Sequence, residues 1–385
     1  MNSENLMKVL FVCNNAFVAG NGLSTSVRNT VRYLRESGVD ARILSGENPD
    51  TNGPKPDFTL KRFHFPLFQP IIDANGYCFA TMDRKVINEA VAWADVVHIA
   101  EPFPIERAVI RVAEKMGKPV VGTFHLYTEN IMTELPPVNW RWTNRLLMNI
   151  WMKGYFNHCS DIQCPSRTVK ELMERCGSTS RLHVISNGIP PSTTPGLGSH
   201  TQEDPILILN VGRLAAAKDQ ITLLRAMEYS RHASRIQLYF AGQGQLLKKY
   251  CAVAAGLVKR GVLTHTPVFA FHTPAQLHEL ASRAYLCVHC ANIEVEGLGC
   301  LESIREGCVP LIAEGPLIAT SEFALVPEST FPASDPKALA EKIDWWKEHP
   351  EKRAEMSPRY AESVKDYSIE SSMEKLMQMY TLALS

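Results

Sequence analysis

The stretch YLCVHCANIEVEGLGCLE, residues 285–302, joins an apolar run to a glycine turn and then to the start of a helical pattern. The run from Tyr285 to Cys290 is nearly all apolar, as expected of a strand covered on both faces in a parallel sheet. The turn opens a helix that Gly307 can end, because glycine is common just past the last helical turn. A strand, a turn and a helix in this order predict one unit of an α/β fold.

The same unit recurs along the whole chain. Val9 to Val12 is a short apolar run, and Val27, Val31 and Leu34 after it mark one face of a helix. Alternation of this kind favours two doubly wound, Rossmann-like sheets of parallel strands with helices on both faces. Further strands are predicted at Val96 to Ile99, Val120 to Phe124, Ile206 to Val211, Ile236 to Ala241 and Val309 to Ala313.

A length of 385 residues suits two domains better than one hydrophobic core. Between Asn187 and Pro205, glycine, proline, serine and threonine replace the alternating pattern, as in a linker. We therefore expect an N-terminal domain over residues 1–190, a C-terminal domain over residues 191–366, and a last helix over residues 367–385 that packs back on the N-terminal domain. In such an architecture the two domains would face a central cleft lined by the carboxyl ends of both sheets.

Composition narrows the class of protein. An apolar fraction of 45% and a charged fraction of 21% are ordinary for a globular enzyme, and 40 basic residues balance 40 acidic ones, so no overall field would recruit nucleic acid. No signal-peptide pattern or membrane-spanning run is evident, and the cysteines lie mostly in apolar stretches, so we expect a cytoplasmic protein. Cys287 and Cys290 could be half of a zinc site, but no second ligand pair follows at suitable spacing, and no metal is expected.

Two carboxylates, Glu294 and Glu302, flank the start of the predicted helix. Free N–H groups and the positive end of the helix dipole favour a phosphate there, and Leu298 and Gly299 would bring the backbone close to it. Glu302 could accept both hydroxyls of a ribose, and Glu294 would face the group attached beyond the phosphates. The alternative is that Glu302 only favours the helix dipole and that Glu294 is solvated.

A second group of candidates, Gly212, Arg213 and Lys218, follows the first predicted strand of the C-terminal domain. The two cations could neutralise a departing nucleoside diphosphate, since Arg grips phosphate oxygens through a planar fork and Lys acts as a point charge. Solvated surface charges are the alternative. Gly242, after the next strand, would approach the same nucleotide, although a tight turn explains it equally well.

In the N-terminal half, His125 ends a predicted strand and would look into the same cleft, where functional side chains gather in an α/β sheet. A satisfied structural histidine is the alternative. The loop from Ala19 to Thr25 is glycine-rich and precedes a helix, but it lacks the full spacing of a dinucleotide or P-loop motif. This loop is a candidate for phosphate or acceptor binding.

Together these motifs resemble the retaining glycosyltransferases of family 4, which have the GT-B architecture, over nearly the whole chain. The resemblance rests on Glu294 and Glu302 as a Glu-x7-Glu pair and on five further segments, which are Val211 to Leu214 with Lys218, Pro165 to Arg167, Val184 to Gly188, Thr123 to His125 and Gly242 to Gly244.

The resemblance implies a role for each candidate residue. Arg213 and Lys218 hold the donor diphosphate, Glu302 the ribose, and Glu294 the transferred sugar. His125 contacts that sugar from the opposite domain, and Gly22 approaches the phosphates through its backbone. Two features depart from the family pattern. In the Glu-x7-Glu loop, Glu296 replaces the usual aromatic residue, and Gly299 and Cys300 are unusual neighbours. In the N-terminal loop, Gly22 is a single glycine where many members have two.

The resemblance further implies retaining transfer of a hexose, without a metal, from a nucleotide-sugar to a hydroxyl of a lipid, lipid-linked or glycan acceptor. No DxD-like acidic pair follows a strand, and Arg213 and Lys218 could supply the charge instead. A UDP-sugar is the first expected donor and GDP-mannose the second. Two alternatives remain: a nucleotide-sugar epimerase, and a catalytically inactive transferase-like binding partner.

Residues 138–156 interleave aromatic and basic side chains, and no acidic residue occurs from Leu135 to Ser160. This composition suits a helix that rests on an anionic membrane, at the inner face of the cell membrane, and brings a lipid acceptor to the enzyme. The alternative is a helix of the N-terminal domain that is apolar nearly all round and buried.

Overall fold

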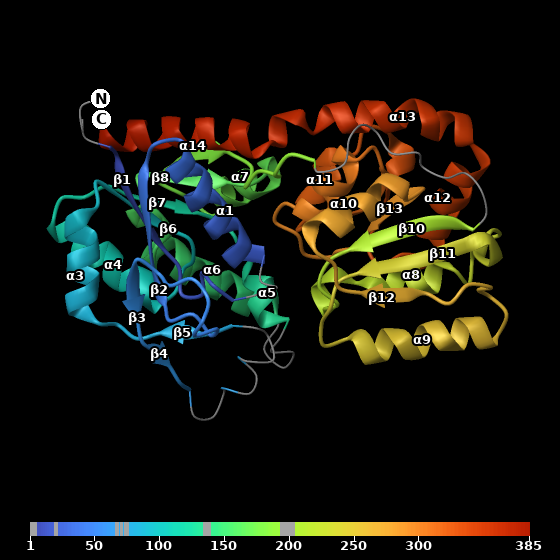
Figure 1. Cartoon of the computed structure of the whole chain (residues 1–385), viewed down its shortest axis with the longest axis horizontal. Helices are drawn as coiled ribbons and strands as arrows, with labels where there is room; N and C mark the ends of the chain where they lie inside the picture. The colour runs from blue at the N-terminus through green and yellow to red at the C-terminus, as the bar shows by residue number, and fades with distance from the viewer. Residues whose placement is uncertain are drawn as a thin grey trace. The chain divides into compact units, whose positions relative to one another are not determined.

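The computed structural model describes residues 6–18, 22–65, 69, 72, 77–133, 140–192 and 205–385. The chain divides into two compact units: unit 1 consists of Met1–Gly188 with Ile369–Ser385, and unit 2 of Ile189–Ser368 (Figure 1). Most of the linker expected from the sequence, residues 193–204, lies outside the described residues.

Unit 1 contains a seven-stranded sheet with the order β3-β2-β1-β6-β7-β8-β9, in which all neighbouring strands are parallel. A separate antiparallel hairpin pairs β4 (Arg62–Phe63) with β5 (Phe79–Ala80). The strands of the large sheet are β1 (Lys8–Val12), β2 (Asp40–Gly46), β3 (Phe58–Leu60), β6 (Val96–Ile99), β7 (Val120–Thr123), β8 (Asp161–Cys164) and β9 (Arg181–Val184).

Helices cover this sheet because its strands are buried on both faces. Val9 and Phe11 of β1 pack into one cluster with the apolar stripes of α1 and α14, although α14 is the last helix of the chain and is drawn in red in Figure 1. Helices α3 and α4 also contact β1. The α-helices of unit 1 in the described ranges are α1 (Gly22–Glu36), α3 (Arg84–Trp93), α4 (Pro104–Lys115), α5 (Thr128–Met132), α6 (Arg141–Gly154), α7 (Arg167–Arg175) and α14 (Ile369–Leu384).

Unit 2 contains a six-stranded parallel sheet with the order β12-β11-β10-β13-β14-β15. Its strands are β10 (Ile206–Val211), β11 (Ile236–Ala241), β12 (Val268–Ala270), β13 (Leu286–His289), β14 (Val309–Glu314) and β15 (Thr330–Pro332). Its α-helices are α8 (Gln220–Ala226), α9 (Leu247–Lys259), α10 (Pro274–Arg283), α11 (Leu298–Arg305), α12 (Pro336–Glu348) and α13 (Pro350–Ser363).

Both sheets are doubly wound, as predicted. In each, the first strand lies in the interior, and the chain runs outward on one side before it crosses to the other, so the order reverses between β1 and β6 and between β10 and β13. Ligands of open α/β sheets bind at such a switch point, outside the carboxyl ends of the strands. The switch point of unit 2 is therefore the first place to look for a site.

No helix in the described ranges combines the length and the apolar character needed to cross a membrane.

Candidate functional site

Lys218 and Glu294 meet at the switch point of unit 2. Lys218 ends a short 3-10 helix (Ala216–Lys218) after β10, and Glu294 lies in the turn after β13, where the Lys218 ammonium forms an ion pair with Glu294 Oε2. The two loops are also tied together through the backbone, because the N–H of Asn292 donates to the carbonyl of Ala217 at 2.9 Å. Two residues that are 76 positions apart in sequence are thus in contact, and their shared role in donor binding stays a prediction.

The backbone of Glu294 is fixed on both sides. Its N–H donates to the carbonyl of Leu317 at 2.8 Å, and its own carbonyl accepts from the N–H of Ala319 at 2.9 Å. These two bonds form an isolated parallel bridge between Glu294 and Ile318. The carboxylate therefore projects from a rigid turn rather than from a free loop.

The Glu294 side chain is 12% exposed and carries two partners on one oxygen. Besides Lys218, His289 Nε2 lies 3.1 Å from Glu294 Oε2. Burial raises the pKa of Glu294, but the charge of Lys218 and the hydrogen bond from His289 outweigh burial and lower that pKa from 4.5 to about 2. Glu294 is a carboxylate at neutral pH, so it can accept hydrogen bonds from sugar hydroxyls.

The glycines of the site allow close packing between loops. A Cβ on Gly242 would clash with the backbone carbonyl of Gly212, and a Cβ on Gly299 would lie 2.8 Å from Val211 Cγ1 at the end of β10. Gly297 has φ of +87° and precedes α11, and Leu298, the first residue of that helix, packs partly against the core. Packing explains Gly242 and Gly299, and their predicted contact with a nucleotide stays a prediction.

Glu302 lies in α11 with its carboxylate open. None of the described residues donates a hydrogen bond to this carboxylate, and the side chain is half-buried. Burial raises the pKa of Glu302, Arg305 opposes this and Glu306 adds to it. Glu296, which replaces the usual aromatic residue, is only 3% exposed and so is part of the interior of unit 2.

Arg213 follows β10 and is exposed. Its backbone carbonyl accepts from Gln220 Nε2 at 2.9 Å, which fixes the backbone of the loop. Arg213 and Lys218 are therefore both cations of the loop after β10, and Lys218 forms an ion pair with Glu294.

The candidates of unit 1 are His125 and Gly22. His125 follows β7, and burial lowers its pKa from 6.5 to about 4, so the imidazole is neutral at pH 7. Gly22 is the first residue of α1, and a Cβ there would meet no atom of the described residues within 4 Å. The protein's own packing thus gives no reason for a glycine at position 22. Residues 19–21 of the same predicted loop lie outside the described part of the chain.

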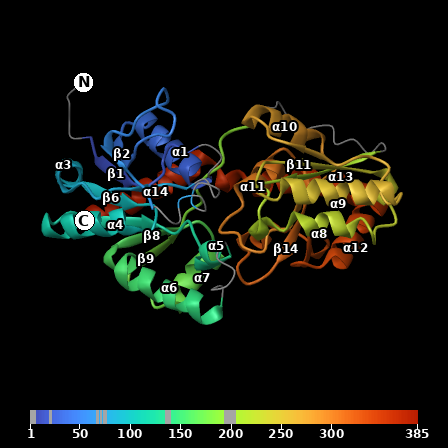
Figure 2. The same ribbon diagram turned by 90° about the horizontal axis from the view of Figure 1, so that it is seen from below.

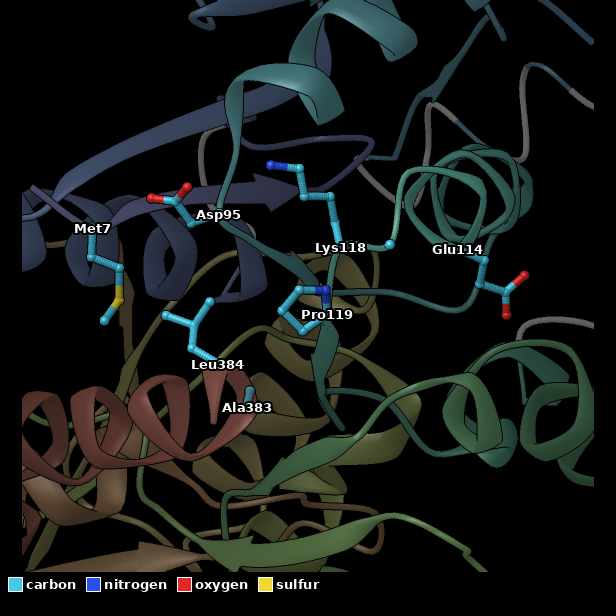
Figure 3. A pocket seen from close by; sticks show the side chains of 8 residues that line it. Met7, Asp95, Glu114, Lys118, Pro119, Ala383 and Leu384 are labelled. Atoms are coloured by element: carbon cyan, nitrogen blue, oxygen red, sulfur yellow. The ribbon is translucent and has the colours of Figure 1, made fainter. Parts of the chain in front are cut away.

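Figure 3 shows a pocket of unit 1 that is not a candidate for the donor. Met7 precedes β1, Asp95 precedes β6, and Lys118 and Pro119 precede β7, so the pocket lies at the amino ends of the strands. Ligands of doubly wound sheets bind at the opposite edge. Within the described ranges there is also no group of three or more His, Cys, Asp or Glu side chains placed to hold a metal ion.

Family comparisons identify both halves of the chain. Residues 20–193 match the family model described as Glycosyltransferase Family 4, and residues 198–362 match the one described as Glycosyl transferases group 1. The chain belongs to glycosyltransferase family 4. It is therefore an enzyme of a retaining hexosyltransferase family, and its two Rossmann-like sheets are those of the GT-B fold. Comparison with curated proteins gives no match.

Two solved structures that match almost the whole length of this family 4 transferase share its fold, and a third matches a shorter part of the chain. HepE of Anabaena in complex with UDP and glucose is 15% identical, with a TM-score of 0.72 over 98% of this chain and 100% of that chain. Sucrose-phosphate synthase of Thermosynechococcus elongatus is 14% identical, with a TM-score of 0.73 over 98% of both chains. The catalytic domain of the cholesterol-α-glucosyltransferase of Helicobacter pylori is 38% identical over 42% of this chain and 100% of that domain, with a TM-score of 0.38.

Sequence reasoning missed His289 of this transferase, which lies inside the predicted strand from Tyr285 to Cys290. The residue is 4% exposed at the carboxyl end of β13 and contacts Glu294. A signal was present, because the argument that favoured His125, a histidine that ends a buried strand, applies equally to His289.

Helix α6 is not buried all round, so the alternative prediction of a buried helix within residues 138–156 is wrong. Its residues Met148, Trp151 and Met152 face the interior, whereas Trp142, Leu146 and Ile150 are 61%, 52% and 53% exposed. Figure 2 shows α6 at the outer edge of unit 1. Residues 138 and 139 of the predicted segment lie outside the described residues.

Proposed function

We propose that this enzyme transfers a hexose from a UDP-sugar to an acceptor hydroxyl, with retention of configuration and without a metal. The observation that supports the proposal is the ion pair between Lys218 and Glu294. It joins the cation that we propose for the diphosphate to the carboxylate that we propose for the sugar. Uridine diphosphate is the proposed leaving group because HepE of Anabaena, which shares the fold, is described in complex with UDP and glucose.

The proposed mechanism gives each charge a role. The acceptor oxygen forms a bond to the anomeric carbon on the face from which the diphosphate leaves, while the bond from that carbon to the phosphate oxygen breaks. Negative charge grows on the departing diphosphate, which takes up the proton of the acceptor hydroxyl. Arg213 and Lys218 would stabilise that charge, as preorganised cations do in phosphate transfer sites. The open carboxylate of Glu302 would accept the ribose hydroxyls, and Glu294 the hydroxyls of the sugar. His125 is proposed to contact the same sugar as a neutral imidazole.

Transfer should not depend on a divalent cation. With UDP-glucose as donor, we expect the same turnover in excess chelator as in added magnesium or manganese, because Arg213 and Lys218 supply the positive charge. Product analysis by mass spectrometry, with UDP- and GDP-sugars and a panel of acceptors, measures this. Activity that is lost in chelator and restored only by the metal would contradict the proposal.

The same assay separates the alternative functions. An epimerase would convert the nucleotide-sugar without any acceptor, and an inactive binding partner would bind it without forming a product. The acceptor panel should include a sterol, named for the Helicobacter pylori relative, together with diacylglycerol and a soluble glycan.

We further propose that the acceptor is a lipid or lipid-linked alcohol, reached from an anionic membrane at the inner face of the cell. The support is the outer face of α6, where Trp142, Leu146 and Ile150 are exposed beside the basic residues Arg141, Arg145 and Lys153. No acidic residue occurs from Leu135 to Ser160. Exposed aromatic and aliphatic side chains among cations suit insertion at the headgroup level with attraction to anionic lipid.

Flotation with vesicles tests the membrane surface. We expect the wild-type protein to float with phosphatidylglycerol vesicles at low salt and to remain below with phosphatidylcholine vesicles, since the basic residues need anionic lipid. Replacing Trp142, Leu146 and Ile150 together with serine should weaken binding about fivefold, because about 1 kcal/mol of apolar insertion is lost.

A matched control for flotation exists in unit 2. Tyr229→Ser with Leu247→Ser removes side chains that are 55% and 37% exposed and should leave binding unchanged. Equal loss in both variants, or no vesicle binding by the wild type, would remove the membrane surface and leave the donor proposal intact.

A further inference from the structure

The two oxygens of the Glu294 carboxylate are in different states. Oε2 accepts from both Lys218 and His289, whereas no residue in the described ranges is hydrogen-bonded to Oε1. A carboxylate only accepts hydrogen bonds, so His289 Nε2 must carry a proton to donate to it. One oxygen therefore has two partners, and the other has none among the described residues.

The two donors to Oε2 differ in mobility. Lys218 has a flexible four-carbon stem, and its side chain is 26% exposed. The His289 side chain is 6% exposed, and its backbone is fixed in β13, where it pairs with Ile312 of β14. Of the two contacts, only the one from His289 is held by the sheet itself.

Donor binding would make the two contacts unequal. If Lys218 faces the diphosphate, as the proposed function requires, its ammonium is shared between Glu294 and the phosphate oxygens, and the phosphate competes for its hydrogens. Glu294 would then lose part of its support when the sugar arrives. A second donor that does not contact the phosphate would keep the carboxylate in place.

We infer that His289 is a positioning residue, which holds Glu294 Oε2 while Lys218 engages the diphosphate and thereby keeps Oε1 directed at the transferred sugar. This inference rests on the proposed function and deepens it. The affinity for the donor has a part from the nucleotide and a part from the sugar. His289 would affect only the part from the sugar, because it acts through Glu294.

The test compares UDP with UDP-glucose in titration calorimetry of the full chain. For His289→Leu, we expect the affinity for UDP to stay within about twofold of the wild type, while the affinity for UDP-glucose falls about fivefold, which corresponds to about 1 kcal/mol. A purely structural loss would weaken both ligands equally. His289→Gln keeps an N–H donor on a side chain of similar reach and should recover most of the UDP-glucose affinity.

The control is His232→Leu. It removes another histidine of unit 2, whose Nε2 lies 3.1 Å from Glu348 Oε1 and which precedes β11 at the amino end of the sheet. This variant should leave both affinities unchanged.

Three outcomes would overturn the inference and leave the UDP donor assignment intact. Equal weakening of both ligands in His289→Leu would assign the residue to folding, and unchanged affinities would leave it without a role. If His289→Leu does not fold, His289→Gln is compared with a Glu294→Gln variant instead. Equally low affinities of these two variants for UDP-glucose would show that an N–H donor at position 289 does not support Glu294. Failure of the wild type to bind either ligand would instead remove the UDP donor assignment, and the inference with it, so the two failures are distinguishable.

Discussion

Lys218→Ala should lower turnover by about a hundredfold, because a positioned cation that stabilises developing charge in a buried site contributes roughly 3 kcal/mol to the transition state. The ion pair with Glu294 adds a second loss. Without Lys218, burial acts on Glu294 with only His289 to oppose it, and the pKa of Glu294 rises from its value of about 2. The variant therefore removes the positive charge of Lys218 from the proposed donor site and makes the Glu294 carboxylate easier to protonate.

Lys249→Ala is the matched control for this prediction. Lys249 is an exposed lysine of α9 in the same unit, and none of the described residues forms an ion pair with it. Initial rates at saturating UDP-glucose should be unchanged in this control. Near-wild-type rates for Lys218→Ala would refute the role proposed for Lys218. Arg213 would then be the remaining cation proposed to contact the diphosphate.

Much of the fold follows from short apolar runs, because a strand buried on both faces leaves a simple pattern. Strands β10 and β11 have the predicted bounds. Helix α10 is capped by Thr273, whose Oγ1 accepts from the N–H of Gln276 at 3.4 Å, and a threonine followed three residues later by a glutamine is a local signal for a helix start. In both cases local chemistry and the final structure agree, which is why the sequence was sufficient.

Other strands escaped prediction because tertiary pairing replaces hydrophobic pattern. Strand β8 contains Asp161, which is fully buried, and this charge is tolerated because Arg181 of the neighbouring β9 donates to both carboxylate oxygens at 2.8 Å. Such a strand reads as polar when taken alone. Its partner lies 20 residues later, and nothing local marks the two as neighbours.

The candidate site shows the same division. The Glu-x7-Glu spacing after β13 predicted Glu294 as a site residue, and the cations after β10 predicted Lys218. The contact between them was not predictable, because it depends on the pairing of β10 with β13 in the sheet. His289 was missed because period-two histidines and cysteines in a strand are usually packing residues. Its role depends on a turn that carries Glu294 back over the end of the same strand, a geometry fixed by backbone bonds to Leu317 and Ala319.

Gly242→Ala should destabilise unit 2 by more than about 3 kcal/mol, the upper range for overpacking a site that cannot relax. Its new Cβ would clash with the backbone carbonyl oxygen of Gly212 and lie 2.8 Å from the carbonyl carbon. Neither atom is the end of a flexible side chain. The N–H of Gly212 also donates to the carbonyl of Ala241 at 3.1 Å, so the two loops cannot separate without breaking this bond.

Gly256→Ala makes the opposite prediction from the same kind of change. Gly256 lies inside α9, and a Cβ there would meet no atom within 4 Å. Alanine should therefore raise the stability of unit 2 by up to about 1 kcal/mol, since glycine is a poor helix residue. Scanning calorimetry of both variants measures the two shifts. Equal midpoints would mean that the loops after β10 and β11 separate easily, and the fixed position of Lys218 beside Glu294 would then lose its structural basis.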